Sequence, residues 1–252
     1  MSGWLEELGF RLGRALRTYR RGPSAATSTL AVSSAWDPAQ ACSNLGLFHL
    51  SAAQMAEREI TVTVIGELDL PTGEIIACDP LTTGTDWPAF SRKVKSGRYP
   101  VSLLEARGRV AAAVLRFRPG TPFRWELATL PDQDASTLKG EQVFGYPVDV
   151  GLGSFMDRTA MVLMSEQRDK LEPHQNYYDD VLAAEFAPNQ DRFVMHHPVP
   201  GNQTNIAIFS SGWGDGIYAS FWGLDVAGQP LLLMTDFEVL ENADGRESNQ
   251  AN

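Results

Sequence analysis

Cysteine is scarce in this sequence, and long apolar runs are missing from it. Only Cys42 and Cys78 occur among the 252 residues, and they do not form a CxxC motif. A disulfide framework or a cysteine zinc site is therefore not expected, and a reducing cytoplasm fits best. No stretch approaches the roughly 18 to 20 apolar residues that a membrane-spanning helix needs. We therefore expect a cytoplasmic protein without a transmembrane segment.

The motifs of common enzymes are also missing. The sequence contains no HExxH, HxH, GxSxG, GxGxxG or GxxxxGKS/T pattern. The adjacent His196 and His197 would point to opposite faces of a strand, so they would not hold one metal ion together. A zinc enzyme, a Ser-His-Asp hydrolase and a nucleotide-binding enzyme are therefore disfavoured. We expect no cofactor.

Acidic residues outnumber basic ones, and the imbalance is uneven along the chain. The net charge is −10 at pH 7, although residues 1–22 carry five arginines against Glu6 and Glu7. An acidic body repels the phosphates of nucleic acids, so no nucleic-acid partner is expected. A basic protein partner, a small cation or a metal ion is the better electrostatic match.

Composition divides the chain into four parts. Residues 1–21 are predicted to form a basic amphipathic helix, because leucines recur at steps of three and four while the arginines lie outside that stripe. Such a helix is suited to peripheral docking on an anionic membrane or on a partner, or it packs on its own domain. Residues 22–36 are predicted to be a linker, 37–241 a single β-rich globular domain and 242–252 a flexible tail.

Most of the remaining pattern is typical of β-strands. Residues 60–70 alternate apolar and polar side chains, and the turn at 71–73 leads into 74–81, which predicts a hairpin. Two short helices are predicted, one from Ser154 to about Lys170 and one around 176–186. Close spacing of the strands favours antiparallel pairing. The fold class is therefore α+β and β-dominated, a mostly antiparallel sheet or sandwich with two short helices, plus the N-terminal amphipathic helix.

Two glycine-rich segments are candidates for function. At 149–157, glycines precede the predicted helix start, which is typical either of a structural turn or of a weak anion site. At 210–225, alternate glycines predict a tight reversal between two strands, and Trp213 at its tip suggests contact with a ligand or partner. The candidate binding residues are Trp213, Asp215, Tyr218, Trp222, Asp225 and Tyr146.

Four aspartates at predicted strand ends are candidates for a shared site. They are Asp79, Asp149, Asp157 and Asp215. If they converge, their oxygens suit Mg²⁺ or Ca²⁺, and a pair of them suits acid–base chemistry. Aspartate is also a common turn former, so the alternative is that each has only a local role.

Four long motifs follow one another in the chain. They are "IACDPL" (76–81), "GYPVDVGLGSFMD" (145–157), "FSSGWGDGIYASFWGLD" (209–225) and "LLLMTDFEVL" (231–240). Together they resemble the uncharacterised bacterial domain-of-unknown-function family numbered forty-two forty-one, over roughly 45–240. The resemblance implies neither an activity nor a catalytic residue.

Our leading functional hypothesis is a cytosolic recognition protein, of the partner-binding or toxin-neutralising (immunity) type, with a basic protein as partner. The acidic body, the missing enzyme motifs and the aromatic turn favour it. One alternative is a metal-assisted hydrolase that uses the aspartate cluster with Mg²⁺ or Ca²⁺. Another is a cargo or structural module addressed by residues 1–21.

Overall fold

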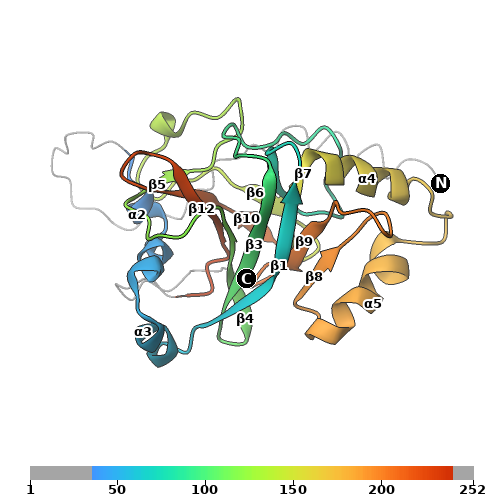
Figure 1. The fold of residues 1–252 in the computed structure, drawn as a ribbon, viewed down its shortest axis with the longest axis horizontal. Coiled ribbons are helices and arrows are strands. Elements are labelled where there is room, and N and C mark those ends of the chain that lie inside the picture. Colours follow the sequence, from blue (N-terminus) through green and yellow to red (C-terminus); the bar gives the residue numbers. More distant parts are fainter. Residues whose placement is uncertain (1–35, 241–252) are drawn as a thin grey trace.

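The computed structural model describes residues 36–240, which form three antiparallel sheets (Figure 1). The predictions for residues 1–21, for the linker up to residue 35 and for the tail 242–252 lie outside the described residues. The largest sheet has six strands in the order β1-β3-β4-β12-β11-β5. Their bounds are β1 Thr61–Leu70, β3 Gly97–Ala106, β4 Arg109–Arg116, β12 Pro230–Asp236, β11 Ser220–Leu224 and β5 Arg124–Leu127.

Two smaller sheets complete the β-structure. A four-stranded sheet has the order β2-β7-β9-β8, and a two-stranded sheet pairs β10 with β6. Their bounds are β2 Ile75–Cys78, β7 Leu152–Asp157, β9 Ile206–Ser210, β8 Phe193–His196, β10 Gly216–Tyr218 and β6 Tyr146–Val148. All the strand pairs in the three sheets are antiparallel.

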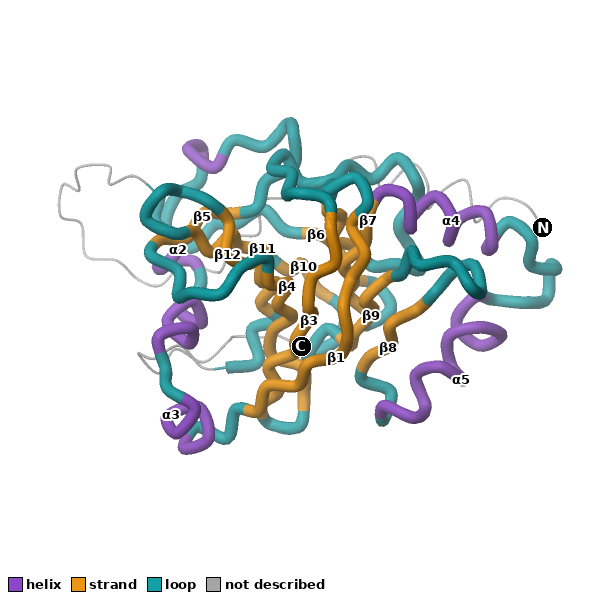
Figure 2. The backbone as a smooth tube through the Cα atoms, viewed as in Figure 1, coloured by secondary structure: helices purple, strands orange, loops and turns teal. Residues whose placement is uncertain are grey.

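Short helices flank the strands on two sides (Figure 2). Near the six-stranded sheet they are α2 Pro38–Ala41, the 3-10 segment η1 Ser43–His49 and α3 Ala52–Glu57. Beside the four-stranded sheet they are α4 Arg158–Arg168, the π-helical turn η3 Tyr178–Leu182, α5 Ala183–Phe186 and the 3-10 turn η4 Ala187–Asn189. A further 3-10 turn, η2, spans Ala135–Thr137.

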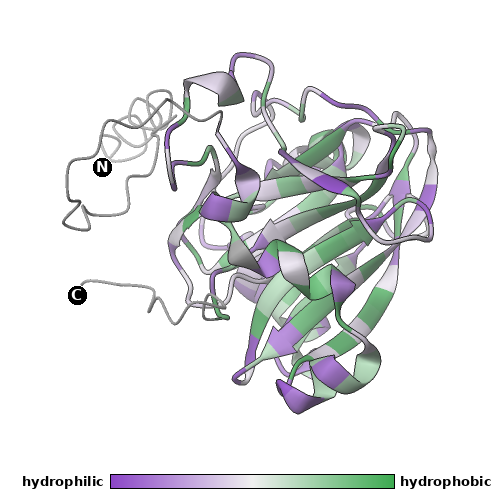
Figure 3. Cartoon of the chain, turned by 90° about the vertical axis from the view of Figure 1, so that its left-hand side faces the viewer, coloured by the Kyte–Doolittle hydropathy of each residue, from purple (hydrophilic) through white to green (hydrophobic). Residues whose placement is uncertain are grey.

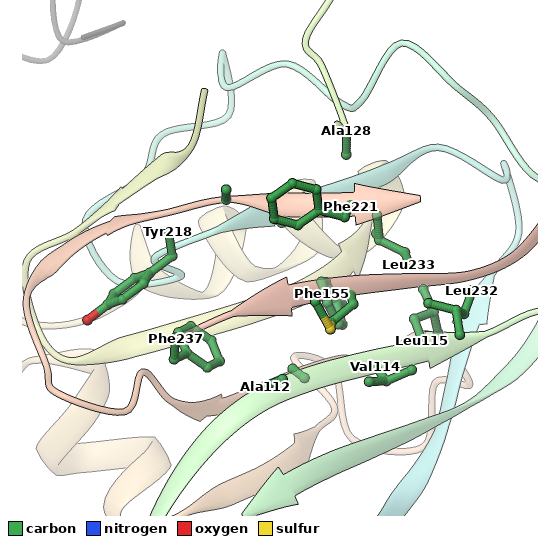
Figure 4. Packing of buried hydrophobic residues seen from close by; sticks show 14 of the residues in the cluster. Ala112, Val114, Leu115, Ala128, Phe155, Tyr218, Phe221, Leu232, Leu233 and Phe237 are labelled. Atoms are coloured by element: carbon green, nitrogen blue, oxygen red, sulfur yellow. The ribbon is translucent and has the colours of Figure 1, made fainter. Parts of the chain in front are cut away.

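The four-stranded sheet is buried on both faces. Phe155 and Phe209 pack into the core shared with the six-stranded sheet, whereas Met156 and Ile208 pack against the helices. Figure 4 shows Phe155 among side chains of the six-stranded sheet. All six residues of β7 are buried, including Ser154 and Asp157, so the strand has no exposed face that would produce an alternation in the sequence. In Figure 3 hydrophobic residues run along the strands, while hydrophilic ones gather at strand ends and in the surrounding loops.

The predicted fold class is confirmed: the described chain is β-dominated, mostly antiparallel and has few short helices. Both cysteines are free and buried. Within residues 36–240, no helix combines the length and the apolar character needed to span a bilayer.

The predicted hairpin between residues 60–70 and 74–81 is wrong. Strand β1 pairs with β3, and β2 pairs with β7 in the other sheet. The connection turns away from β1 because the N–H and the hydroxyl of Thr72 both donate to Asp157, at 3.0 and 2.8 Å. The turn therefore joins two sheets instead of closing one ladder.

The predicted helix start at Ser154 is also wrong. Residues Leu152–Asp157 form β7, and α4 begins at Arg158. Asp157 is the N-cap residue, and its Oδ1 accepts the N–H of Thr159 at 2.9 Å. Ser154 instead donates its hydroxyl to the carbonyl of Cys78 on the neighbouring strand, at 2.8 Å.

Candidate functional site

Two glycine-rich turns lie side by side at the end of the two-stranded sheet. Residues 149–151 connect β6 to β7, and residues 211–215 connect β9 to β10. The N–H of Ser211 donates to the carbonyl of Gly151 at 3.0 Å, so the turns are in direct contact. We call these two segments the paired-turn rim. Because β9 and β10 belong to different sheets, residues 211–215 do not form the predicted reversal between paired strands.

The 211–215 turn depends on glycine for its path. Gly212 has φ +65°, and a Cβ there would lie 2.8 Å from the Val239 side chain and 3.0 Å from the Val110 carbonyl oxygen. The hydroxyls of Ser211 and Tyr218 both donate to the carbonyl of Gly214, at 2.8 and 2.9 Å. The turn is therefore fixed by its own glycine and by two buried hydroxyl-bearing residues.

Trp213 is the aromatic residue that the rim presents. Its relative exposure is 39%, the largest of any tryptophan in the described part of the chain. The central carbon of the Arg109 guanidinium lies 4.3 Å from the centroid of a Trp213 ring, and Nη1 of Arg109 donates to the Gly212 carbonyl at 2.9 Å. Arg109 comes from the start of β4, so a remote hairpin orients this indole.

A buried carboxylate holds the other turn. Asp79 is fully buried, and its Oδ2 accepts the N–H groups of Asp149 and Val150 at 2.9 and 3.0 Å. Its Oδ1 accepts the N–H of Leu81 at 3.0 Å. Three charge-assisted hydrogen bonds compensate for taking this group out of water. Asp79 therefore positions the rim from below and is not a surface residue.

Two further carboxylates face solvent at the rim. The β6–β10 ladder ends at the pair Gly216↔Val148, and the next positions outward are Asp215 and Asp149. Both residues are exposed. Val150, at 46% exposure, lies next to them in the chain. The rim thus combines an indole, an apolar side chain and two acidic groups on a fixed backbone.

The two predicted tyrosines lie beneath this surface. Burial raises the pKa of Tyr218 to about 12, and burial also raises the pKa of Tyr146, so both phenols are protonated at neutral pH. Tyr218 packs edge-on against Phe237, with 5.0 Å between ring centroids, and Figure 4 shows the two rings together. The Tyr146 hydroxyl is buried and has no hydrogen-bond partner within residues 36–240.

Trp222 and Asp225 lie away from the rim. Trp222 is 2% exposed and packs against Phe90 and Phe117 in the core, with centroid distances of 6.2 and 5.8 Å. Asp225 accepts the N–H groups of Ala227 and Gln229 in the β11–β12 turn, at 2.9 and 2.8 Å. These hydrogen bonds, and the one from Arg118, lower the pKa of Asp225.

The structure does not bring all four predicted aspartates together. Asp157 pairs with Ile75 at one end of β2, whereas Asp79 follows Cys78 at the other end. At about 3.3 Å per residue, the two positions are about 13 Å apart along the strand. Within residues 36–240, no group of three or more His, Cys, Asp or Glu side chains is arranged to hold a metal ion.

Residues 68–235 match the family model described as "Protein of unknown function (DUF4241)". The chain belongs to this family. The DUF4241 match begins in β1 and ends in β12, so it includes Asp79, Arg109 and both turns of the rim. Searches of curated proteins and of solved structures return no match.

Sequence reasoning missed Val150, which belongs to the paired-turn rim, and Arg109, which contacts it. The sequence does not indicate a role for Arg109, because no local pattern links a cation at a strand start to its partner. Val150 has no sequence feature that distinguishes it from the other valines. A single signal was available: "DVG" at 149–151 and "GDG" at 214–216 each combine Asp with Gly beside a strand. That signal predicts two turns, and only the sheet register places them next to each other.

Proposed function

We propose that this protein is a cytoplasmic recognition protein whose paired-turn rim binds a basic partner protein. Toxin neutralisation of the immunity type is the specific form of this function that we propose. The observation that carries the proposal is the exposure of Trp213 on a turn whose backbone is fixed from below. A rigid, exposed indole gives a large contact area with little loss of conformational entropy on binding.

The charge of the rim supports a basic partner. Asp149 and Asp215 are exposed beside Trp213, and the chain as a whole carries a net charge of −10. Acidic groups around an aromatic anchor raise the association rate with a cationic surface and disfavour acidic competitors. The Arg109 guanidinium is already engaged with Trp213 and with the Gly212 carbonyl, so its role in the proposal is to orient the indole.

The geometry of the four aspartates supports the binding of a partner protein better than it supports metal-assisted hydrolysis. Asp79 and Asp157 use their carboxylate oxygens on N–H groups of nearby turns. Asp149 and Asp215 remain as an exposed pair, which suits a contact with a cationic surface. No specific observation favours Mg²⁺ or Ca²⁺ as a ligand, so we propose binding alone.

Cross-linking in the native host tests the proposal. The tagged full chain is expected to recover a stoichiometric basic protein, and Trp213→Ala is expected to lose it. Phe123→Ala is the matched control, because Phe123 is 70% exposed but lies beside Arg124 and Leu224, at the end of β11 away from the rim. Recovery of no stoichiometric partner, or equal recovery by the wild type and Trp213→Ala, would contradict the proposal.

A further inference from the structure

A cavity of about 440 Å³ lies beside the β3–β4 turn, and none of its lining residues belongs to the rim. Its walls come from η1, from the segment between α3 and β1, and from Ala106 at the end of β3. Figure 1 shows α3 beside the β3–β4 end of the six-stranded sheet. The volume falls within the range of about 300–1,000 Å³ that is typical of small-molecule sites. The rim proposal does not use this cavity.

The walls of the cavity are mainly apolar, with one well-fixed amide among them. Leu47, Leu50 and Ile60 supply aliphatic side chains. Asn44 also lines the cavity, is 5% exposed, and donates Nδ2 to both carboxylate oxygens of buried Asp236, at 3.0 and 3.1 Å. These two hydrogen bonds hold the Asn44 amide in place at the cavity wall.

Charged side chains also line the cavity. They are the guanidinium groups of Arg58 and Arg107 and the carboxylate of Glu59. Arg107 is already engaged, since its Nη1 donates to the Val239 carbonyl at 3.5 Å, so Arg58 is the guanidinium that the cavity offers. Arg58 forms no ion pair with any other residue between 36 and 240. An exposed guanidinium beside aliphatic walls recognises an anionic group attached to an apolar body.

We propose that this cavity binds a small organic anion, with a carboxylate, sulfonate or phosphate group on an apolar body. The apolar body packs on Leu47, Leu50 and Ile60, and the anionic group faces Arg58. This site is separate from the rim, so the two proposals stand or fall independently.

A fluorescent anion tests the site in the full chain. The probe is 8-anilinonaphthalene-1-sulfonate, which is expected to bind saturably at one site per chain. Gly46 lines the cavity, does not require a positive φ, and would have no neighbouring atom within 4 Å of an added Cβ. Gly46→Phe therefore places a ring at the cavity wall without backbone strain and is expected to weaken binding more than about tenfold. Gly46→Ala adds one methyl group and is expected to retain binding within about twofold.

Substitution of Arg58 tests whether the cavity recognises the charge of the ligand. Arg58→Gln is expected to weaken binding of the sulfonate about tenfold, because one charge-assisted contact is lost. Arg98→Gln, an exposed arginine at the opposite end of β3, is the control and is expected to have no effect. The uncharged analogue N-phenyl-1-naphthylamine is expected to bind more weakly than the sulfonate and to be insensitive to Arg58→Gln. Near-ultraviolet circular dichroism confirms that each variant is folded.

Four results would overturn the proposal. They are the absence of saturable binding to the wild type, equal binding to folded Gly46→Phe, equal binding of the sulfonate to Arg58→Gln, and competition by inorganic phosphate at the same concentration as the sulfonate. The last result would show that the apolar body contributes nothing.

Discussion

The guanidinium of Arg109 lies over the indole of Trp213, 4.3 Å from the ring centroid, although 103 residues separate Arg109 from Gly212, the residue before that tryptophan. The contact joins the β3–β4 hairpin to the turn between β9 and β10. It fixes the most exposed tryptophan of the described chain in one orientation. A surface aromatic held in this way loses little freedom on binding, which is the physical basis of the proposed recognition role.

A double-mutant cycle measures this contact. Arg109→Ala and Trp213→Ala are each expected to lower the free energy of unfolding, with a coupling energy of about 0.5–1 kcal/mol between them. Urea unfolding of the wild type, the two single variants and the double variant gives the value. Additive effects would show that the stacking contributes nothing to stability.

Asp79 is expected to contribute more to stability than an aspartate in an exposed turn does. Asp79→Asn leaves a buried amide facing three backbone N–H groups, so we expect a loss of about 2–4 kcal/mol in the free energy of unfolding. Hydrogen exchange at the Asp149 and Val150 amides is expected to accelerate in the same variant. Asp225→Asn is the control, and its effect is expected to be much smaller because Asp225 caps an exposed turn. Equal losses in the two variants would contradict a positioning role for Asp79.

A comparison of Gly212 with Gly140 separates two reasons why a position requires glycine, which are a positive φ and a lack of space for a side chain. Both have positive φ, of +65° and +56°, but only Gly212 also has neighbours within 3.0 Å of an added Cβ. Gly140→Ala is expected to cost about 1 kcal/mol from backbone conformation alone. Gly212→Ala adds a clash with Val239 and Val110, so its cost is expected to be about 3 kcal/mol or more. Thermal unfolding of the two variants compares them directly, and similar shifts would show that the close approach can relax.

The strands of the six-stranded sheet were the most predictable part of the fold. Residues 60–70 alternate apolar and polar side chains, and the structure places β1 at Thr61–Leu70, at the edge of the sheet. The alternation matches burial only in the second half of the strand, where Leu68 and Leu70 are buried, whereas Val62 and Val64 are exposed before the register shift between Val64 and Gly66. Strand β7 was hidden for the opposite reason: Phe155 and Met156 are both buried, on opposite faces, so no period-two pattern marks it. A period-two pattern marks a strand with one buried and one exposed face, and β7 has no exposed face.

The pairing of β1 and β2 could not be predicted from the sequence, for a different reason. The turn at 71–73 has residues that are typical of a hairpin turn. Thr72 nevertheless donates a hydrogen bond to Asp157, which lies 85 residues further on. The same limit applies to the site: Trp213 was predicted to be important from its turn, whereas its partner Arg109 is set by tertiary packing. Asp149 and Asp215 come to the same end of the two-stranded sheet only because Val148 pairs with Gly216.

The described residues also contain a hydrogen-bonded chain that links α5 to β8 and is buried at Tyr177 and His196 but exposed at Glu185. His196 is 2% exposed, its Nδ1 lies 2.9 Å from Glu185 Oε2, and its Nε2 lies 2.8 Å from the Tyr177 hydroxyl. Burial lowers the pKa of His196, and this effect outweighs the opposing influence of the Glu185 carboxylate. The neutral ring then donates from Nδ1 to Glu185 and accepts from Tyr177 at Nε2.

This lowered pKa predicts how stability depends on pH. An unfolded histidine has a pKa near 6.5, so the unfolded chain takes up this proton at a higher pH than the folded chain does. The stability that neutral His196 contributes is therefore complete above about pH 6.5 and is lost as the pH falls through the lowered pKa of the folded state. Urea unfolding between pH 7.5 and 5.0 is expected to show this fall in the wild type and in His197→Gln, whose ring is exposed. His196→Gln is expected to be less stable at pH 7.5 and to show a smaller fall. An equal fall in His196→Gln and the wild type would assign the pH dependence to other groups.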